Sequence, residues 1–197
     1  MAANNHACSS KPRAHSSLHH SPTHHSVLKH MLIVSQIHDK LPEGLTLISA
    51  EGFKEWFIDL QVLDPNPLYI NKTFRLKFTF SDKYPMGISS LPRNPSPYSN
   101  TLTTAPPPEP PEVVFIHSPD RPIPIHPHIY SNGIICLDLL GQNGWSPVQN
   151  VQSISMSLQS MLTGNDKIER PEGDAEFVAN NRQRPRDINF YYHDDTV

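Results

Sequence analysis

The sequence predicts one α+β domain, in which a helix is followed by a meander of four antiparallel strands and then by further helices. Strand-like runs lie close together in the middle of the chain, and apolar side chains alternate with polar ones along the second and third of them. Helical spacing of apolar residues occurs before and after these runs. That order favours an α+β domain over a doubly wound sheet, in which helices and strands alternate along the chain.

The first helix is predicted to begin at Val27, where apolar residues start to recur at helical spacing, and to end before Pro42 and Gly44. Strands are predicted at residues 45–48, 55–62, 73–80 and 113–116. The stretch Asp64-Pro65-Asn66-Pro67 is rich in turn-forming residues. The second and third strands should therefore form an antiparallel hairpin.

A long helix is predicted after the last strand, with Ser146 as its N-cap, Pro147 at its first position and Gly164 as its stop. We expect its apolar stripe to pack on the inner face of the sheet, with its methionines as core residues. The stripe consists of Val151, Ile154, Leu158 and Met161 or Leu162. A last helical segment is predicted at about residues 174–181.

Disorder is predicted for residues 1–26, which are rich in serine and histidine and show no periodicity. Seven of the twelve histidines of the chain lie within the first thirty residues. Their irregular spacing, without cysteine or carboxylate partners, favours a solvated tail over a metal site.

The composition excludes several classes of function. The chain has 197 residues and a formal charge of -3 at pH 7, which argues against binding to nucleic acid or to membrane surfaces. No apolar run is long enough to span a membrane and the N-terminus does not resemble a signal peptide, so we expect a soluble protein of the cytoplasm, the nucleus or both. Cys8 and Cys136 make no disulfide framework, and a reducing compartment would keep Cys136 as a free thiol.

Cys136 lies in the stretch from His126 to Leu140, which is the candidate functional centre of the chain. Pro127 and Gly133 predict an irregular loop there, and such a loop offers backbone donors near the sulfur. Free cysteine is often inert core packing, so these residues alone leave a reactive thiol and a structural one as alternatives.

Five motifs follow one another along the chain around this loop. They are Tyr84-Pro85, Pro111-Glu112-Val113, His126-Pro127-His128, Cys136 and Trp145-Ser146-Pro147. Together they resemble the ubiquitin-conjugating enzymes over roughly residues 27–185, which implies the fold of that family and leaves residues 186–197 as a flexible tail. Most of the family has asparagine at the position of His128. The His-Pro-His variant and the end of the chain, Tyr192 to Thr196, resemble the W-type subfamily.

The resemblance implies that Cys136 accepts the C-terminus of ubiquitin from an ATP-consuming activating enzyme and passes it to an amine, with a RING or U-box ligase. Both steps form a tetrahedral oxyanion that needs a nearby donor. His128 is a candidate for that donor or for a strut of the loop, because an imidazole can donate to either group, whereas His126 is expected to be structural. Asp174 is the candidate carboxylate that assists the amine, with Glu172 as the runner-up.

The choice of amine can be argued from acidity. At pH 7 roughly a tenth of α-amino groups are deprotonated, compared with a few parts in ten thousand of lysine side chains. An α-amine therefore needs less help from the site, and the loss of the asparagine is consistent with the preference for protein N-termini that the W-type resemblance implies. Lysine acceptors, and a ubiquitin-like modifier in place of ubiquitin, are the alternatives.

The resemblance also implies partner contacts. Its ligase-binding positions fall at Lys29, Met86, Pro147 and Val148. Tyr192 and His193 are assigned to a mobile tail that contacts protein substrates with flexible N-termini. We expect neither a cofactor nor a metal.

A proline-rich insertion is predicted at about residues 87–110, where the resembled family usually has a short connection. Thirteen of the 21 prolines fall between Pro85 and Pro127, which excludes a regular strand or helix in most of this part. The segment is either a disordered insertion beside the ligase-binding surface or a short intron translated in frame. If this insertion impairs catalysis, the alternative function is a catalytically weak binding module of the same fold. A thiol hydrolase is disfavoured, because no acid accompanies His126 or His128 in the sequence.

Overall fold

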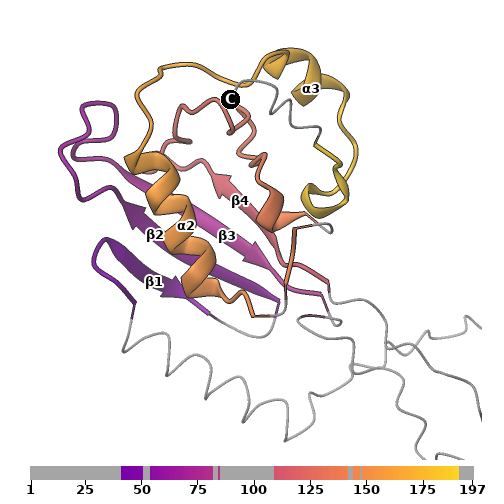
Figure 1. Cartoon of the computed structure of the whole chain (residues 1–197), viewed down its shortest axis with the longest axis horizontal. Helices are drawn as coiled ribbons and strands as arrows, with labels where there is room; N and C mark the ends of the chain where they lie inside the picture. Colours follow the sequence, from indigo (N-terminus) through magenta and orange to yellow (C-terminus); the bar gives the residue numbers. More distant parts are fainter. Residues whose placement is uncertain are drawn as a thin grey trace, which may run out of the picture.

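The computed structural model describes residues 41–50, 54–81, 84, 109–141, 144–146 and 148–190. These residues form a four-stranded antiparallel sheet with helix α2 lying across one face (Figure 1). The strands, in spatial and sequence order, are β1 (Leu45–Ser49), β2 (Glu55–Gln61), β3 (Thr73–Thr79) and β4 (Glu112–Ile116). This order confirms the predicted α+β meander. The predicted first helix and the predicted N-terminal tail lie outside the described residues.

The helices follow the sheet in the sequence. They are the 3-10 helix η1 (Asp138–Leu140), α2 (Val151–Thr163), α3 (Asp174–Asn180) and the 3-10 helix η2 (Pro185–Asp187). The last helical segment predicted from the sequence matches α3 to within one residue. Among the described residues, no helix combines the length and the apolar character needed to cross a membrane.

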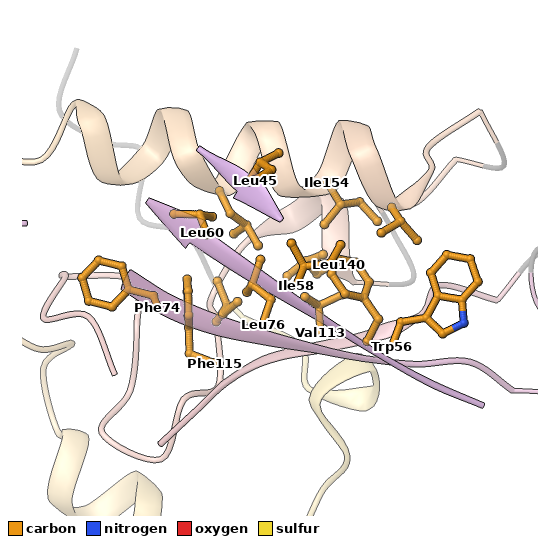
Figure 2. Packing of buried hydrophobic residues seen from close by; sticks show 14 of the residues in the cluster. Leu45, Trp56, Ile58, Leu60, Phe74, Leu76, Val113, Phe115, Leu140 and Ile154 are labelled. Carbon is orange, nitrogen blue, oxygen red and sulfur yellow. The ribbon is translucent and has the colours of Figure 1, made fainter. Parts of the chain in front are cut away.

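The core lies between the sheet and α2 (Figure 2). Alternating residues of β2 and β3 pair directly, with Ile58 opposite Leu76 and Leu60 opposite Phe74, and all four side chains are at most 1% exposed. The predicted apolar stripe of α2 covers them, with Ile154 fully buried. Met156 is 45% exposed, so the expectation that the methionines of this helix are core residues is wrong for Met156. Burial of one such side chain contributes roughly 1.5–3 kcal/mol to the free energy of unfolding. The alternation of side chains along the strands and the helical spacing of apolar residues in α2 therefore determine which side chains face this core.

The start of α2 differs from its prediction. The helix begins at Val151, with Asn150 as its N-cap, and not at Ser146. The Asn150 side chain accepts a hydrogen bond from the Ser153 backbone at 2.8 Å, and the Ser153 hydroxyl accepts one from the Asn150 backbone at 2.9 Å. This reciprocal capping box satisfies two backbone donors that a start at Ser146 would leave to other partners. Gly164 ends the helix as predicted.

Polar and ionic contacts of the C-terminal segment extend the packed part of the chain beyond residue 185. Arg186, in the segment predicted as a flexible tail, is 5% exposed. Its guanidinium donates to a Glu112 carboxylate oxygen at 2.9 Å and to the Pro110 carbonyl at 3.2 Å. The C-terminal segment therefore packs on the domain beyond residue 185. Glu109 and Pro110, predicted as the end of the insertion, also belong to the folded part.

A buried ion cluster holds the loop after β4 against the sheet. Asp59 points away from the core and is 6% exposed, and its carboxylate receives hydrogen bonds from Arg75 at 2.7 Å and from Arg121 at 3.0 Å. Burial alone would raise the pKa of Asp59, but the two guanidinium groups lower it below its ordinary value. The contact between Arg121 and Asp59 thus anchors the start of the loop that leads to the cysteine motif.

Candidate active site

A glycine fixes the shape of the cysteine loop. Gly133 has a φ of +88°, a conformation that side chains with a Cβ rarely adopt. A Cβ at this position would overlap the carbonyl oxygen of Phe115 in β4. The close approach allows the Phe115 amide to donate to the Gly133 carbonyl at 2.9 Å. The loop is therefore attached directly to the edge strand of the sheet.

Cys136 follows this turn, with its side chain half-buried. Its backbone amide donates to the His128 carbonyl at 2.8 Å, and the Tyr130 amide donates to the Ile134 carbonyl at 2.9 Å. The Asn132 side chain closes the turn by accepting from the Ile134 amide at 3.1 Å. These local bonds place the thiol beside the His-Pro-His motif on an irregular loop, as the prolines and glycine predicted.

The two histidines of the motif occupy different environments. His126 is 5% exposed, and its Nδ1 accepts a hydrogen bond from the His128 amide at 2.9 Å. Burial lowers the pKa of His126 to about 4, with a further lowering by His128 and an opposing hydrogen bond to the Met161 backbone. A neutral His126 thus joins the loop to α2, which confirms its expected structural role.

His128 is exposed. Its ring centroid lies 5.5 Å from that of His126. Among the described residues, its imidazole makes no hydrogen bond to the loop. The side chain of His128 is left available to a group bound beside Cys136.

Asp174, at the first position of α3, reaches the same loop. Its carboxylate accepts a hydrogen bond from the Ser131 amide at 2.7 Å, across 43 residues of sequence. Burial raises the pKa of Tyr130, and the nearby Cys136 and Asp174 raise it further. Both groups therefore lie within electrostatic range of Tyr130. The runner-up, Glu172, is exposed and makes no contact of this kind among the described residues.

An aromatic stack holds α3 and the C-terminal segment on the loop. The Tyr130 ring is stacked on Phe177 of α3, with ring centroids 3.8 Å apart, and Phe190 lies 6.1 Å from Tyr130. Tyr130 and its partners were not predicted as site residues. An aromatic residue in a turn carries no signal of its own, and its partners are distant in the sequence.

The predicted partner-binding positions are only partly described. Val148 is 81% exposed, on the segment that precedes α2. Lys29, Met86, Pro147, Tyr192 and His193 lie outside the described residues. Within the described part of the chain, no group of three or more side chains is arranged to hold a metal ion.

Comparisons with known proteins identify the family. Residues 99–188 match the family model described as ubiquitin-conjugating enzyme. The probable ubiquitin-conjugating enzyme E2 W of Dictyostelium discoideum is 33% identical over 79% of this chain and 87% of its own length. The chain belongs to the ubiquitin-conjugating enzymes, in the W subfamily. The ubiquitin-conjugating enzyme E2 W of Caenorhabditis elegans is 32% identical, over 83% of this chain and 92% of its own.

A solved structure supports the fold of this ubiquitin-conjugating enzyme. The E2 enzyme UbcA1 from Agrocybe aegerita matches with a TM-score of 0.63 and 28% identity, over 82% of this chain and 96% of that one. The protein is therefore a transferase that forms thioester intermediates and works with ubiquitin, an activating enzyme and ubiquitin ligases.

Proposed function

We propose that this ubiquitin-conjugating enzyme carries ubiquitin as a thioester on Cys136 and transfers it to the α-amino groups of protein N-termini, with a RING or U-box ligase. The observation that carries this proposal is a loop in which Cys136, with its half-buried thiol, is hydrogen-bonded through its backbone to His128, whose side chain is exposed. The Cys136 amide donates to the His128 carbonyl at 2.8 Å, and among the described residues the His128 imidazole makes a ring contact with His126 and no hydrogen bond.

The transfer step follows from these groups. The amine nitrogen attacks the thioester carbonyl carbon, the new C–N bond forms, and the oxygen gains negative charge in the tetrahedral intermediate. The C–S bond then breaks, the Cys136 sulfur leaves as a thiolate, and the extra proton on nitrogen passes to a base. His128 acts as the donor to the oxyanion in place of the usual asparagine, because its imidazole is exposed and its backbone carbonyl accepts the Cys136 amide.

The Asp174 carboxylate has an oxygen that can accept the proton released by the amine. One of its oxygens accepts the Ser131 amide, and the second makes no hydrogen bond among the described residues. The raised pKa of Tyr130 reflects the proximity of Asp174 and Cys136 to the same ring. We assign Asp174 to the orientation and deprotonation of the incoming amine.

The proposed preference for an α-amine rests on the weak basicity of the side chains at the site. An α-amine is present in its nucleophilic form a few hundred times more often than a lysine at pH 7. Among the described residues, Asp174 is the carboxylate that accepts a hydrogen bond from the cysteine loop, and Asp138 lies two residues after Cys136; carboxylates are weak bases. An acceptor that already contains a large fraction of free amine suits this arrangement better than lysine.

The test measures charging and discharge separately. The enzyme is incubated with activating enzyme, ATP and ubiquitin, and a reductant-sensitive adduct is expected that Cys136→Ala abolishes. The charged enzyme is then given one of two matched peptides. One peptide has a free α-amine and no lysine, and the other is N-acetylated with a single lysine. Discharge onto the first should be at least about tenfold faster.

A variant separates the role of His128. Removal of one oxyanion donor typically lowers a maximal rate by about a hundredfold or more. His128→Ala should therefore slow discharge onto the α-amine peptide, while His128→Gln, which keeps a donor, should retain more of the rate. Equal discharge onto both peptides would refute the α-amine preference, and an unchanged rate in His128→Ala would refute the donor role.

A further inference from the structure

Arg170 lies in the segment between α2 and α3, and its guanidinium donates to three backbone carbonyls. Its Nη1 donates to the carbonyl oxygens of Pro124 at 2.6 Å and Ile129 at 2.9 Å. Its Nη2 donates to the carbonyl of Ile123 at 3.2 Å. Two of these carbonyls precede the His-Pro-His motif and the third, that of Ile129, follows it directly. One half-buried guanidinium thus joins both ends of this stretch.

Packing alone does not hold this stretch in place. Residues 122–125 form one wall of an open cavity of about 240 Å³, whose other walls include Pro67, Lys72 and Ile168. Ile125 is 43% exposed. Besides Arg170, the phenol of Tyr69 donates to the Ile125 carbonyl at 2.7 Å. The position of the stretch therefore depends on directed hydrogen bonds as well as on the packing of Ile123 against the core.

The segment that contains Arg170 grips the cysteine loop at three successive residues. Arg170 binds the Ile129 carbonyl, Phe177 stacks on the Tyr130 ring, and Asp174 accepts the Ser131 amide. Burial lowers the pKa of the Arg170 guanidinium, and the nearby Asp174 opposes this effect. The cation and the carboxylate therefore stabilise each other on the same side of the loop.

We propose that Arg170 is a positioning residue for the transfer step, which fixes residues 129–131 so that Asp174 and Tyr130 stand beside Cys136. This inference rests on the proposed function, in which Cys136 carries the thioester. A guanidinium suits the role because its planar array of donors reaches three carbonyl oxygens at once. A lysine at this position would keep the charge and would concentrate its donors on a single nitrogen.

The test uses the full chain with Arg170→Gln and Arg170→Lys, and with Arg182→Gln as a matched control. Arg182 is exposed, and within the described part of the chain it donates only to the neighbouring Asn181 carbonyl, at 2.9 Å. Charging with ubiquitin and single-turnover discharge onto an α-amine peptide are measured over a range of peptide concentrations. Because small misplacements of reacting groups are costly, Arg170→Gln should lower the maximal discharge rate at least about tenfold. Charging, the half-saturating peptide concentration and the Arg182→Gln control should stay within about twofold of the unsubstituted enzyme.

Two further readouts separate positioning from general support of the fold. Amide hydrogen exchange at Ser131 should accelerate in Arg170→Gln, because its acceptor Asp174 is no longer held. The effect of Arg170→Gln on discharge should shrink in an Asp174→Ala background, since both changes then remove the same arrangement. If Arg170→Gln does not fold, Arg170→Lys decides by the same measurements, with an intermediate loss of rate.

The inference is overturned if Arg170→Gln lowers charging in proportion to discharge or leaves the discharge rate unchanged. It is also overturned if the rate losses caused by Arg170→Gln and Asp174→Ala multiply fully in the double variant. These outcomes are distinct from failure of the proposed function. An enzyme that discharges equally onto both matched peptides would refute the α-amine preference, yet the loss caused by Arg170→Gln would still be measurable. An enzyme that forms no Cys136 adduct would refute the function itself and the inference with it.

Discussion

Protonation of His126 should destabilise the protein as the pH falls below 6.5. The buried imidazole accepts the His128 amide through Nδ1 at 2.9 Å, and a proton on this atom would remove that bond and place a charge next to a second imidazole. The native pKa of about 4 lies below the ordinary value of 6.5. The unfolded chain therefore binds more protons than the native one between these values, so stability is complete above pH 6.5 and is lost towards pH 4.

The size of the effect follows from the two pKa values. Linkage between a native pKa of about 4 and an unfolded pKa of 6.5 gives a loss of about 1.8 kcal/mol between pH 7 and pH 5. The full shift corresponds to about 3.4 kcal/mol. Domains unfold with about 5–15 kcal/mol, so this one group would remove a substantial fraction of the stability.

Urea unfolding at several pH values measures this loss. His126→Gln, which has an amide donor and acceptor but does not titrate, should be less stable at pH 7 and should show a flatter dependence between pH 7 and pH 5. His117→Gln is the matched control, because His117 is exposed and its removal should leave the slope unchanged. If the unsubstituted protein and His126→Gln lose the same free energy over this range, the argument from a buried neutral imidazole is wrong.

Two other substitutions test the cysteine loop and the predicted ligase-binding position Val148. Gly133→Ala should lower the free energy of unfolding by about 2–4 kcal/mol, because it combines a positive φ with overlap at the Phe115 carbonyl. Gly173→Ala, with a φ of +70° and no atom within 4 Å of the new Cβ, should cost only about 1 kcal/mol. Equal losses in urea unfolding would rule out the overlap. Val148→Asp should reduce the stimulation of discharge by a RING or U-box ligase about tenfold or more, as a truncated hot spot does. Leu63→Asp, at a side chain that is 53% exposed, should not reduce it, and retained stimulation in Val148→Asp would remove this surface from the interface.

The strands and the apolar face of α2 could be predicted because their signals are local. The alternation of Trp56, Ile58 and Leu60 reports the pleat of one strand without reference to the rest of the chain. The start of α2 could not be predicted with the same success. A Ser-Pro pair and an Asn-x-x-Ser stretch both offer cap chemistry, and the capping box at Asn150 and Ser153 is the one that the structure uses.

The packed C-terminal segment shows a different limit. The polar residues after 185 resemble a solvated tail, yet Arg186 is buried because Glu109 and Glu112 supply the opposite charge. The partners of Arg186 lie more than seventy residues earlier in the sequence. A charged residue carries no local sign of such a pairing, so composition predicts exposure where a distant carboxylate allows burial.

The sequence by itself determined the meander, the core stripe of α2 and the motifs around Cys136, since these depend on periodicity and turn chemistry within short stretches. The tertiary structure alone decided what surrounds the thiol. It buried His126 and exposed His128, and it brought Arg170 and Asp174 to the cysteine loop across 41 and 43 residues. Contacts of that separation are selected by the packing of the whole domain, because no local pattern specifies which distant donor meets which backbone group.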